Sequence, residues 1–240
     1  MHITEKLSRK QADLYGAEPV TIAFLGDSVT QGCFEIYRNG PNSCETYFEP
    51  QHAYSARLRE MLAILYPSVQ VNIINSGISG DNAPNGLRRL ERDVLRYHPD
   101  LVVVSYGLND SGRGDAGIAD YTAALDGIFA ALESAGIESI FLTENMMNTH
   151  VSVHTTDPFF VGLAENLASI QNSGLLDRYF EAGKQAAVAH GARICDCYAK
   201  WKRLAAGGVD VTELLANKVN HPTREMVYLF AVSLLETMFS

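Results

Sequence analysis

The 240-residue chain has few cysteines, a single tryptophan and fewer basic than acidic residues. Its 19 Lys and Arg against 28 Asp and Glu give a formal net charge of −9. This charge argues against a general affinity for nucleic acid or anionic membranes, because both require clustered cations. Apolar runs also stay short of the about 18 residues that a membrane-spanning helix needs. We therefore expect neither nucleic acid nor a membrane as partner.

The four cysteines are Cys33, Cys44, Cys195 and Cys197. The last two are separated by one residue, which is the wrong spacing for a redox or zinc pair, so free thiols are expected. His150 and His154 have the spacing of helical metal ligands but no acidic ligand at a fitting distance, so no metal site is expected. The first six residues lack the apolar core of a secretory signal. A cytoplasmic protein is predicted, unless a signal has been trimmed.

Five apolar, β-branched runs alternate with amphipathic stretches along the chain. The runs are Val20–Leu25, Val69–Asn75, Leu101–Tyr106, Glu138–Thr143 and Ala192–Asp196. The stretches, which we expect to be helices, are Tyr54–Tyr66, Gly86–Tyr97, Ile118–Ala135, Leu175–His190 and Glu225–Phe239. This alternation predicts an α/β fold, in which a five-stranded parallel sheet carries helices on both faces.

No repeat, low-complexity segment or Pro/Gly-rich linker divides the chain. A single domain over residues 1–240, with its core at about 20–240, is therefore expected. Thr143–Gly174 is unusual, because it follows the fourth predicted strand and is long for a loop. It either covers a site or packs as a surface loop.

Polar residues gather directly after the predicted strands. In an open parallel sheet, ligands bind in the crevice at the carboxyl ends of the strands. The segments there are Gly26-Asp27-Ser28, Asn75 to Asn82, Gly107 to Asp110 and, before the last helix, Asn220-His221-Pro222. We expect their side chains to meet at the solvent-facing edge of the sheet.

Each of these residues has an ordinary structural interpretation beside a chemical one. Ser28 either caps a helix or acts as a nucleophile. Gly80 either permits a positive φ or brings its N–H close to a substrate oxygen. Asn109 either completes a turn or stabilises developing negative charge. His221, held by Pro222 at a helix start, is either exposed to solvent or the base for Ser28.

Taken together, the segments resemble the SGNH (GDSL) hydrolase superfamily, which carries Ser, Gly, Asn and His in four signature blocks. The similar segments are Gly26-Asp27-Ser28, Asn75-x-Gly77-x-x-Gly80, Gly107-x-Asn109-Asp110 and His221-Pro222. Their order also agrees, and the resemblance extends from Val20 to the last helix. It implies a flavodoxin-like, three-layer α/β/α fold and an esterase that forms an acyl-serine without a cofactor or metal. Ser28 and His221 would be catalytic, and the oxyanion hole would consist of Ser28, Gly80 and Asn109.

One position departs from the family pattern. The family places Asp three residues before His to complete a triad, whereas this chain has Lys218 there. A lysine side chain cannot accept a hydrogen bond from an imidazole N–H. The alternatives are the Lys218 carbonyl, the side chain of Asn217 or Asn220, or an acid such as Asp210 or Glu213. We favour a Ser-His dyad held by a neutral acceptor.

The resemblance implies substrates among acetylated carbohydrates, lipids and thioesters. Because the composition is acidic and no amphipathic lid is obvious, we expect small acyl esters, acetyl in particular, carried on carbohydrate. The alternatives are a lysophospholipase or thioesterase with the same machinery, and a catalytically decayed glycan-binding protein. Candidate aromatic residues for stacking on sugars are Trp201, Tyr198, Phe34 and Tyr37, although core roles are the default. The oligomeric state stays open.

Overall fold

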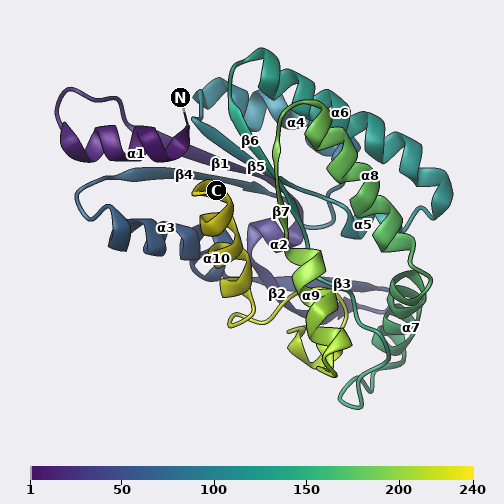
Figure 1. The fold of residues 1–240 in the computed structure, drawn as a ribbon. Coiled ribbons are helices and arrows are strands. Elements are labelled where there is room, and N and C mark those ends of the chain that lie inside the picture. The colour runs from purple at the N-terminus through teal and green to yellow at the C-terminus, as the bar shows by residue number, and fades with distance from the viewer. Residues whose placement is uncertain (1) are drawn as a thin grey trace.

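Five parallel strands form a sheet at the centre of the computed structural model, which describes residues 2–240 (Figure 1). They are β1 (Val20–Gly26), β4 (Val71–Gly77), β5 (Leu101–Ser105), β6 (Glu138–Thr143) and β7 (Arg193–Asp196), in the order β4-β1-β5-β6-β7. This order confirms the predicted flavodoxin-like sheet. The chain reverses its direction of travel across the sheet between β1 and β5, and such a switch point opens a crevice at the carboxyl ends of the strands.

Helices cover the sheet on both faces, as the uncharged strands require. Every residue of β5 is buried, and β1 is buried except at Thr21. One face carries α4 (Ala83–Asp93), α6 (Ile118–Ser134) and α8 (Leu175–Ala189), whereas α3 (Tyr54–Leu65) and α10 (Val227–Met238) pack together on the other (Figure 1). Within residues 2–240, none of the helices has the length and hydrophobicity needed to span a bilayer.

The predicted strands and helices occur with small shifts at their ends. The predicted helix Gly86–Tyr97 begins earlier, at Ala83, because the Asn82 side chain accepts a hydrogen bond from the Asn85 N–H at 3.1 Å and caps it. Interpreting Thr143–Gly174 as a loop was wrong, since it contains α7 (Pro158–Asn172). Asp157 caps that helix, and Pro158 occupies its first turn. The helices α1 (Ile3–Ala12) and α9 (Cys197–Ala206) were also not predicted.

A two-stranded antiparallel hairpin, β2 (Cys33–Gly40) and β3 (Ser43–Phe48), lies outside the sheet and extends toward α7 (Figure 1). It starts directly after α2 (Ser28–Gln31), the short helix that follows β1. Its pairing is irregular, with register shifts between Cys33 and Ile36 and between Arg38 and Gly40. The hairpin therefore leaves the carboxyl edge of the sheet close to the residues that the sequence analysis singled out.

Candidate active site

Ser28 lies where β1 turns into α2, at the switch point of the sheet. Asp27 caps the helix by accepting a hydrogen bond from the Val29 N–H at 2.9 Å. Gly26 makes the turn possible, because a Cβ at this position would lie 2.7 Å from the Ser105 carbonyl oxygen on β5. Ser28 is thus placed by the backbone at the carboxyl end of the sheet.

The structure brings Ser28 and His221 together although 193 positions separate them. Ser28 Oγ lies 3.0 Å from His221 Nε2, and His221 Nδ1 lies 2.9 Å from the carbonyl oxygen of Phe34. A carbonyl only accepts hydrogen bonds, so the ring proton is on Nδ1 and Nε2 is free to accept the hydroxyl proton of Ser28. This tautomer is the one that a general base requires.

The acceptor on Nδ1 is not among those that the sequence analysis considered. The neutral acceptor is a main-chain carbonyl, but it comes from Phe34 in β2 and not from the turn before His221. The Lys218 side chain, at the position of the family's Asp, pairs with Glu213 at 2.9 Å instead. Asp210 accepts from the backbone N–H of Thr212. These candidate groups are therefore engaged elsewhere.

Asn217 organises the turn that presents the histidine. Its side-chain oxygen accepts hydrogen bonds from the backbone N–H groups of Asn220 and His221, each at 2.9 Å. Its side-chain nitrogen donates to the Asn220 side-chain oxygen at 2.8 Å. The Asn217 amide thus fixes the backbone, as Asn often does in turns, and the imidazole proton goes to the Phe34 carbonyl and to neither asparagine.

Both reacting side chains are almost fully buried, which corrects the expectation of a solvent-facing edge. Ser28 is 3% exposed and His221 is 4% exposed. Burial lowers the pKa of His221 to about 4, because the imidazolium would lose its hydration. The hydrogen bond to the Phe34 carbonyl and the charge of Glu35 oppose this shift only in part. His221 is therefore neutral at neutral pH.

The backbone N–H groups of Ser28 and Gly80 are candidates for binding an anion. Gly80 adopts φ +76° in the loop after β4, and the space over its Cα is open. Within residues 2–240, neither the Ser28 N–H nor the Gly80 N–H makes a backbone hydrogen bond outside regular helices and strands. The role of Ser28 and Gly80 as oxyanion donors stays a prediction, and the free N–H groups are compatible with it.

Asn109 lies near these donors, but its amide is already engaged. Its side-chain nitrogen donates to Asp27 Oδ2 and to the Asp81 carbonyl oxygen, at 2.9 Å each. These two bonds use both amide hydrogens. Asn109 therefore has to release or share one of them before it can bind a further anion.

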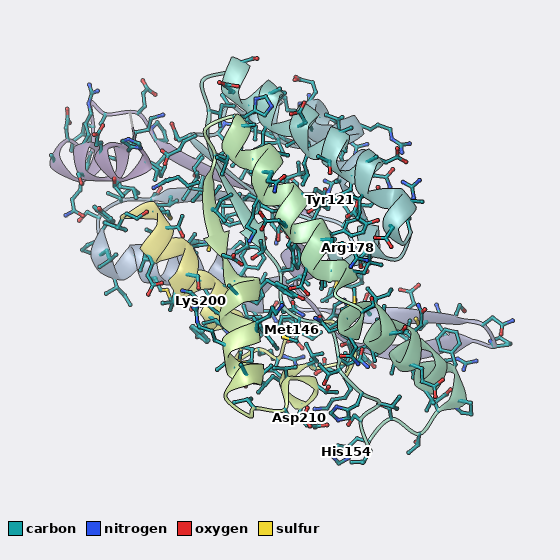
Figure 2. The ribbon with its side chains drawn as sticks, turned by 45° about the vertical axis from the view of Figure 1, so that its right-hand side comes forward. Tyr121, Met146, His154, Arg178, Lys200 and Asp210 are labelled. Atoms are coloured by element: carbon teal, nitrogen blue, oxygen red, sulfur yellow. The ribbon has the colours of Figure 1, made fainter. Side chains whose placement is uncertain are left out.

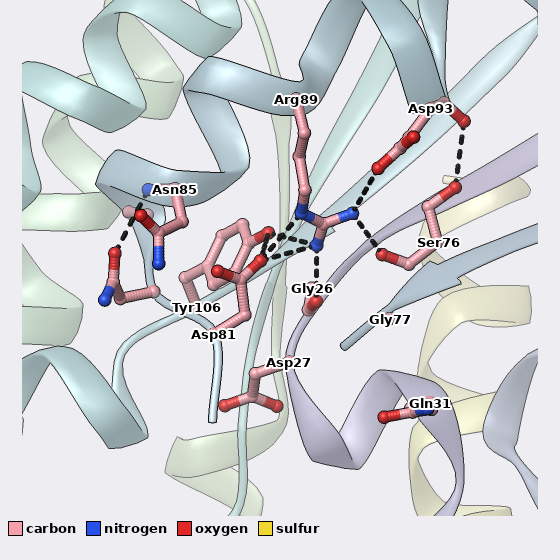
Figure 3. Close-up of polar contacts among 12 residues, drawn as sticks. Gly26, Asp27, Gln31, Ser76, Gly77, Asp81, Asn85, Arg89, Asp93 and Tyr106 are labelled. Atoms are coloured by element: carbon pink, nitrogen blue, oxygen red, sulfur yellow. Dashed lines mark hydrogen bonds and ion pairs between the residues drawn. The ribbon is translucent and has the colours of Figure 1, made fainter. Parts of the chain in front are cut away.

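A buried arginine, Arg89, stabilises the ends of β1 and β4 and the loop after β4. The sequence did not predict this role. Arg89 on α4 is 7% exposed and pairs with Asp81, with 2.7 Å between Nη2 and Oδ2. Its guanidinium also donates to the carbonyl oxygens of Ser76 at 2.6 Å and Gly26 at 2.9 Å (Figure 3). It thereby ties the ends of β4 and β1 together. An arginine in an amphipathic helix is ordinarily expected in solvent, so the sequence held no signal for this role.

The carboxyl groups of Asp27, Asp110 and Glu144 are buried near Ser28 and Asn109. Burial raises the pKa of Asp27 to about 6 and that of Asp110 to about 7. Glu144, which follows β6 and is fully buried, accepts from the Leu108 N–H at 3.1 Å. Burial, together with the nearby Asp27 carboxyl, raises the pKa of Glu144 well above its ordinary value. Glu144 thus links the end of β6 to the segment that carries Asn109.

A family model described as the GDSL-like lipase/acylhydrolase family matches residues 24–226. The chain belongs to this family. An acetylxylan esterase of Geobacillus stearothermophilus is 30% identical over 92 residues, which are 38% of this chain and 40% of that protein. An arylesterase of Vibrio mimicus is 44% identical over 52 residues, or 22% of this chain and 26% of that protein. The matched segments thus span less than half the length of either curated relative.

Solved structures support the same fold for this GDSL-family chain. An acetylxylan esterase from Geobacillus stearothermophilus superimposes with a TM-score of 0.66 at 22% identity, covering 91% of this chain and 94% of that one. A two-domain esterase active on acetylated mannans gives a TM-score of 0.68 at 18% identity, covering 99% of this chain and 52% of that one. Both likenesses concern the fold.

Other residues that the sequence analysis considered lie elsewhere in the GDSL-family fold. Figure 2 shows His154 and Asp210 in the loops at one end of the molecule. His150 Nε2 lies 3.4 Å from Asp210 Oδ2. Of the four aromatic residues considered for sugar stacking, Trp201, Tyr198 and Phe34 are buried in the core, and only Tyr37 is exposed. Stacking of the buried three on a sugar is thereby contradicted.

Proposed function

We propose that the protein is a serine esterase that hydrolyses small acyl esters, acetyl esters of carbohydrate in particular, through an acyl-serine intermediate. One observation carries the proposal. Ser28 Oγ and His221 Nε2 are 3.0 Å apart while Nδ1 is held by a carbonyl, which is the geometry of a nucleophile with its base.

In the proposed reaction, His221 Nε2 takes the Ser28 proton as Oγ attacks the acyl carbon. The resulting oxyanion receives hydrogen bonds from the N–H groups of Ser28 and Gly80, and Asn109 joins them by giving up a bond to Asp27 or Asp81. The imidazolium then returns the proton to the leaving alcohol, and the acyl-serine forms. Water, activated by His221, attacks this ester, and the acid leaves as Oγ regains its proton.

A dyad with a carbonyl acceptor is expected to work more slowly than a triad. The Phe34 carbonyl stabilises the imidazolium less than a carboxylate would. It nevertheless fixes the productive tautomer. The loss of about 10⁴ in kcat seen when a protease triad's Asp becomes Asn arises from the wrong tautomer, so that penalty does not apply in full here.

The burial of Ser28 supports a small acyl group. Only 3% of Ser28 is exposed, which favours a compact acyl group at Oγ. The names of the relatives, an acetylxylan esterase and an arylesterase, also point to short or compact esters. A lysophospholipase or thioesterase would need a longer acyl pocket, and a decayed glycan-binding protein would not need an intact pair of Ser28 and His221.

The test compares kcat/KM for p-nitrophenyl acetate with that for p-nitrophenyl octanoate. We expect a clear preference for p-nitrophenyl acetate. In a second assay, the protein should release acetate from acetylated xylo- or manno-oligosaccharides. A preference for octanoate would overturn the assignment to small acyl esters in favour of the lipid or thioester alternative. Binding of oligosaccharides without turnover of any ester would favour the decayed protein.

Activity should be lost on acidification only at an unusually low pH. The base must be neutral, so activity is lost as pH falls through the pKa of His221, which is about 4 in place of the ordinary value near 6.5. A profile of kcat/KM from pH 3 to 8, measured by acetate release, checks this. A midpoint near 6.5 would show that the imidazole is solvated during turnover and would contradict the buried geometry.

A further inference from the structure

The acceptor for His221 belongs to a hairpin that is not part of the main sheet. Within residues 2–240, β2 and β3 pair with one another and with no other strand, so sheet hydrogen bonds do not fix the Phe34 carbonyl relative to His221. The buried Phe34 ring packs in the core, and a polar contact joins this part of β2 to the segment that carries His221. Arg224, three residues beyond His221, makes that contact.

The Arg224 guanidinium binds both ends of the hairpin. It donates two hydrogen bonds to Glu35, from Nη1 at 2.6 Å and from Nη2 at 2.9 Å. It also donates from Nε to Glu49 at 3.0 Å, and Nη2 makes a second bond to the same carboxylate. Its central carbon lies 4.5 Å over the centre of the Phe34 ring.

Glu35 and Glu49 lie at the two ends of the hairpin, so their contact with Arg224 constrains the segment that carries the Phe34 carbonyl. Glu35 directly follows Phe34 in β2, and Glu49 directly follows the end of β3, so one guanidinium spans the base of the hairpin. On the other side, the Thr223 N–H donates to the Leu214 carbonyl at 2.9 Å, which fixes the backbone between His221 and Arg224. The planar fork of arginine suits two carboxylates at once, unlike the ammonium of lysine.

We propose that Arg224, Glu35 and Glu49 form a positioning clamp that holds the Phe34 carbonyl against His221 Nδ1. The clamp performs the orienting task that a carboxylate performs in a serine-hydrolase triad. The inference rests on the proposed esterase function, because orientation of His221 matters only if Ser28 and His221 react. Glu35 is the charged group of the clamp that also acts on the imidazole directly.

The test uses Arg224→Gln, with Arg38→Gln as its matched control. Arg38 lies on the same hairpin, its side chain is equally exposed at 29%, and it pairs with Asp157 at 3.1 Å while lying 4.6 Å over the Phe159 ring. It shares with Arg224 this exposure, an ion pair and an aromatic ring under the guanidinium, but its partners Asp157 and Phe159 do not belong to the base of the hairpin. Both variants are assayed well below their unfolding temperatures, so that a loss of stability alone leaves kcat unchanged.

We expect Arg224→Gln to lower kcat by about 10- to 100-fold with little change in KM, because a displaced base costs rate without costing binding. The acid limb of the profile should move upward from about 4, since water then reaches the imidazole and relieves the burial that lowers its pKa. Arg38→Gln should keep the wild-type kcat and acid limb. Equal values for Arg224→Gln and wild type would overturn the clamp.

The His221 Nδ1 proton gives a readout that does not depend on turnover. In wild type and Arg38→Gln its NMR signal should be resolved and slow to exchange with water, and in Arg224→Gln it should be lost. If wild type hydrolyses no ester but the signal behaves in this way, the proposed function fails and the clamp stands. If Arg224→Gln does not fold, Arg224→Lys serves in its place, with an intermediate loss of kcat expected. Signal and kcat unchanged in that variant would reject the clamp.

Discussion

Ser28→Ala is expected to lower kcat for p-nitrophenyl acetate by about 10⁴-fold or more, while the protein stays folded. Ser28 Oγ is the atom that lies 3.0 Å from His221 Nε2, and its removal leaves the base without a nucleophile. His221→Ala should cost about as much, and the double variant hardly more, because the two residues act as one unit. Steady-state kinetics on the three purified variants measure this.

The control for Ser28→Ala is Ser105→Ala. Ser105 is a fully buried serine at the end of the neighbouring strand β5, and its hydroxyl donates to the Leu142 carbonyl at 3.0 Å, away from His221. Its replacement should leave kcat close to the wild-type value. Turnover by Ser28→Ala at the wild-type rate would place the hydrolysis elsewhere and remove the basis of the proposed mechanism.

Arg89→Met is expected to reduce the free energy of unfolding by about 3–5 kcal/mol, the typical cost of removing one partner of a buried ion pair. The change leaves the Asp81 carboxylate buried without its countercharge, and it removes the donor from the carbonyl oxygens of Ser76 and Gly26 (Figure 3). Urea unfolding followed by circular dichroism measures the difference. Replacing Asp81 by Asn as well should restore part of the loss, because the uncompensated charge is then gone.

Arg92→Met serves as the matched control for Arg89→Met. Arg92 lies on the same helix and pairs with the neighbouring Asp93, but its side chain is 67% exposed. Ion pairs in solvent contribute little to stability, so the unfolding curve should not change measurably. An equally small effect of Arg89→Met would mean that the loops at the carboxyl edge do not depend on the buried guanidinium.

The sheet and the approximate place of the site could be predicted because they depend on local patterns. Leu101 to Val104 are apolar and uncharged, which is typical of a strand covered on both faces. Gly26 and Gly107 end two of the apolar runs, and parallel topology places the residues after both glycines at a single edge of the sheet. The approach of His221 to Ser28 was expected from the four signature blocks together, since neither residue is distinctive alone.

The acceptor of the imidazole proton could not be predicted, for a physical reason. It is a main-chain carbonyl, which every residue carries, so the identity of Phe34 holds no information about it. The hairpin that presents it mixes charged and polar residues, and its partly exposed strands lack the regular alternation that marks a half-buried strand. The candidates near Lys218, its own carbonyl included, all lie in the segment before His221, whereas the acceptor lies 187 positions away in β2.

The origin of this acceptor changes which alterations the catalytic apparatus tolerates. Any amino acid at position 34 carries a carbonyl, so the group that accepts the His221 proton is set by where the chain places that peptide unit and not by the identity of residue 34. Deletion of Cys33, the residue between Gly32 and Phe34, would place a different peptide unit opposite the imidazole. Such a chain would still contain Ser28, Gly80, Asn109 and His221. In this protein, an intact set of signature residues and an intact active site are therefore separate properties.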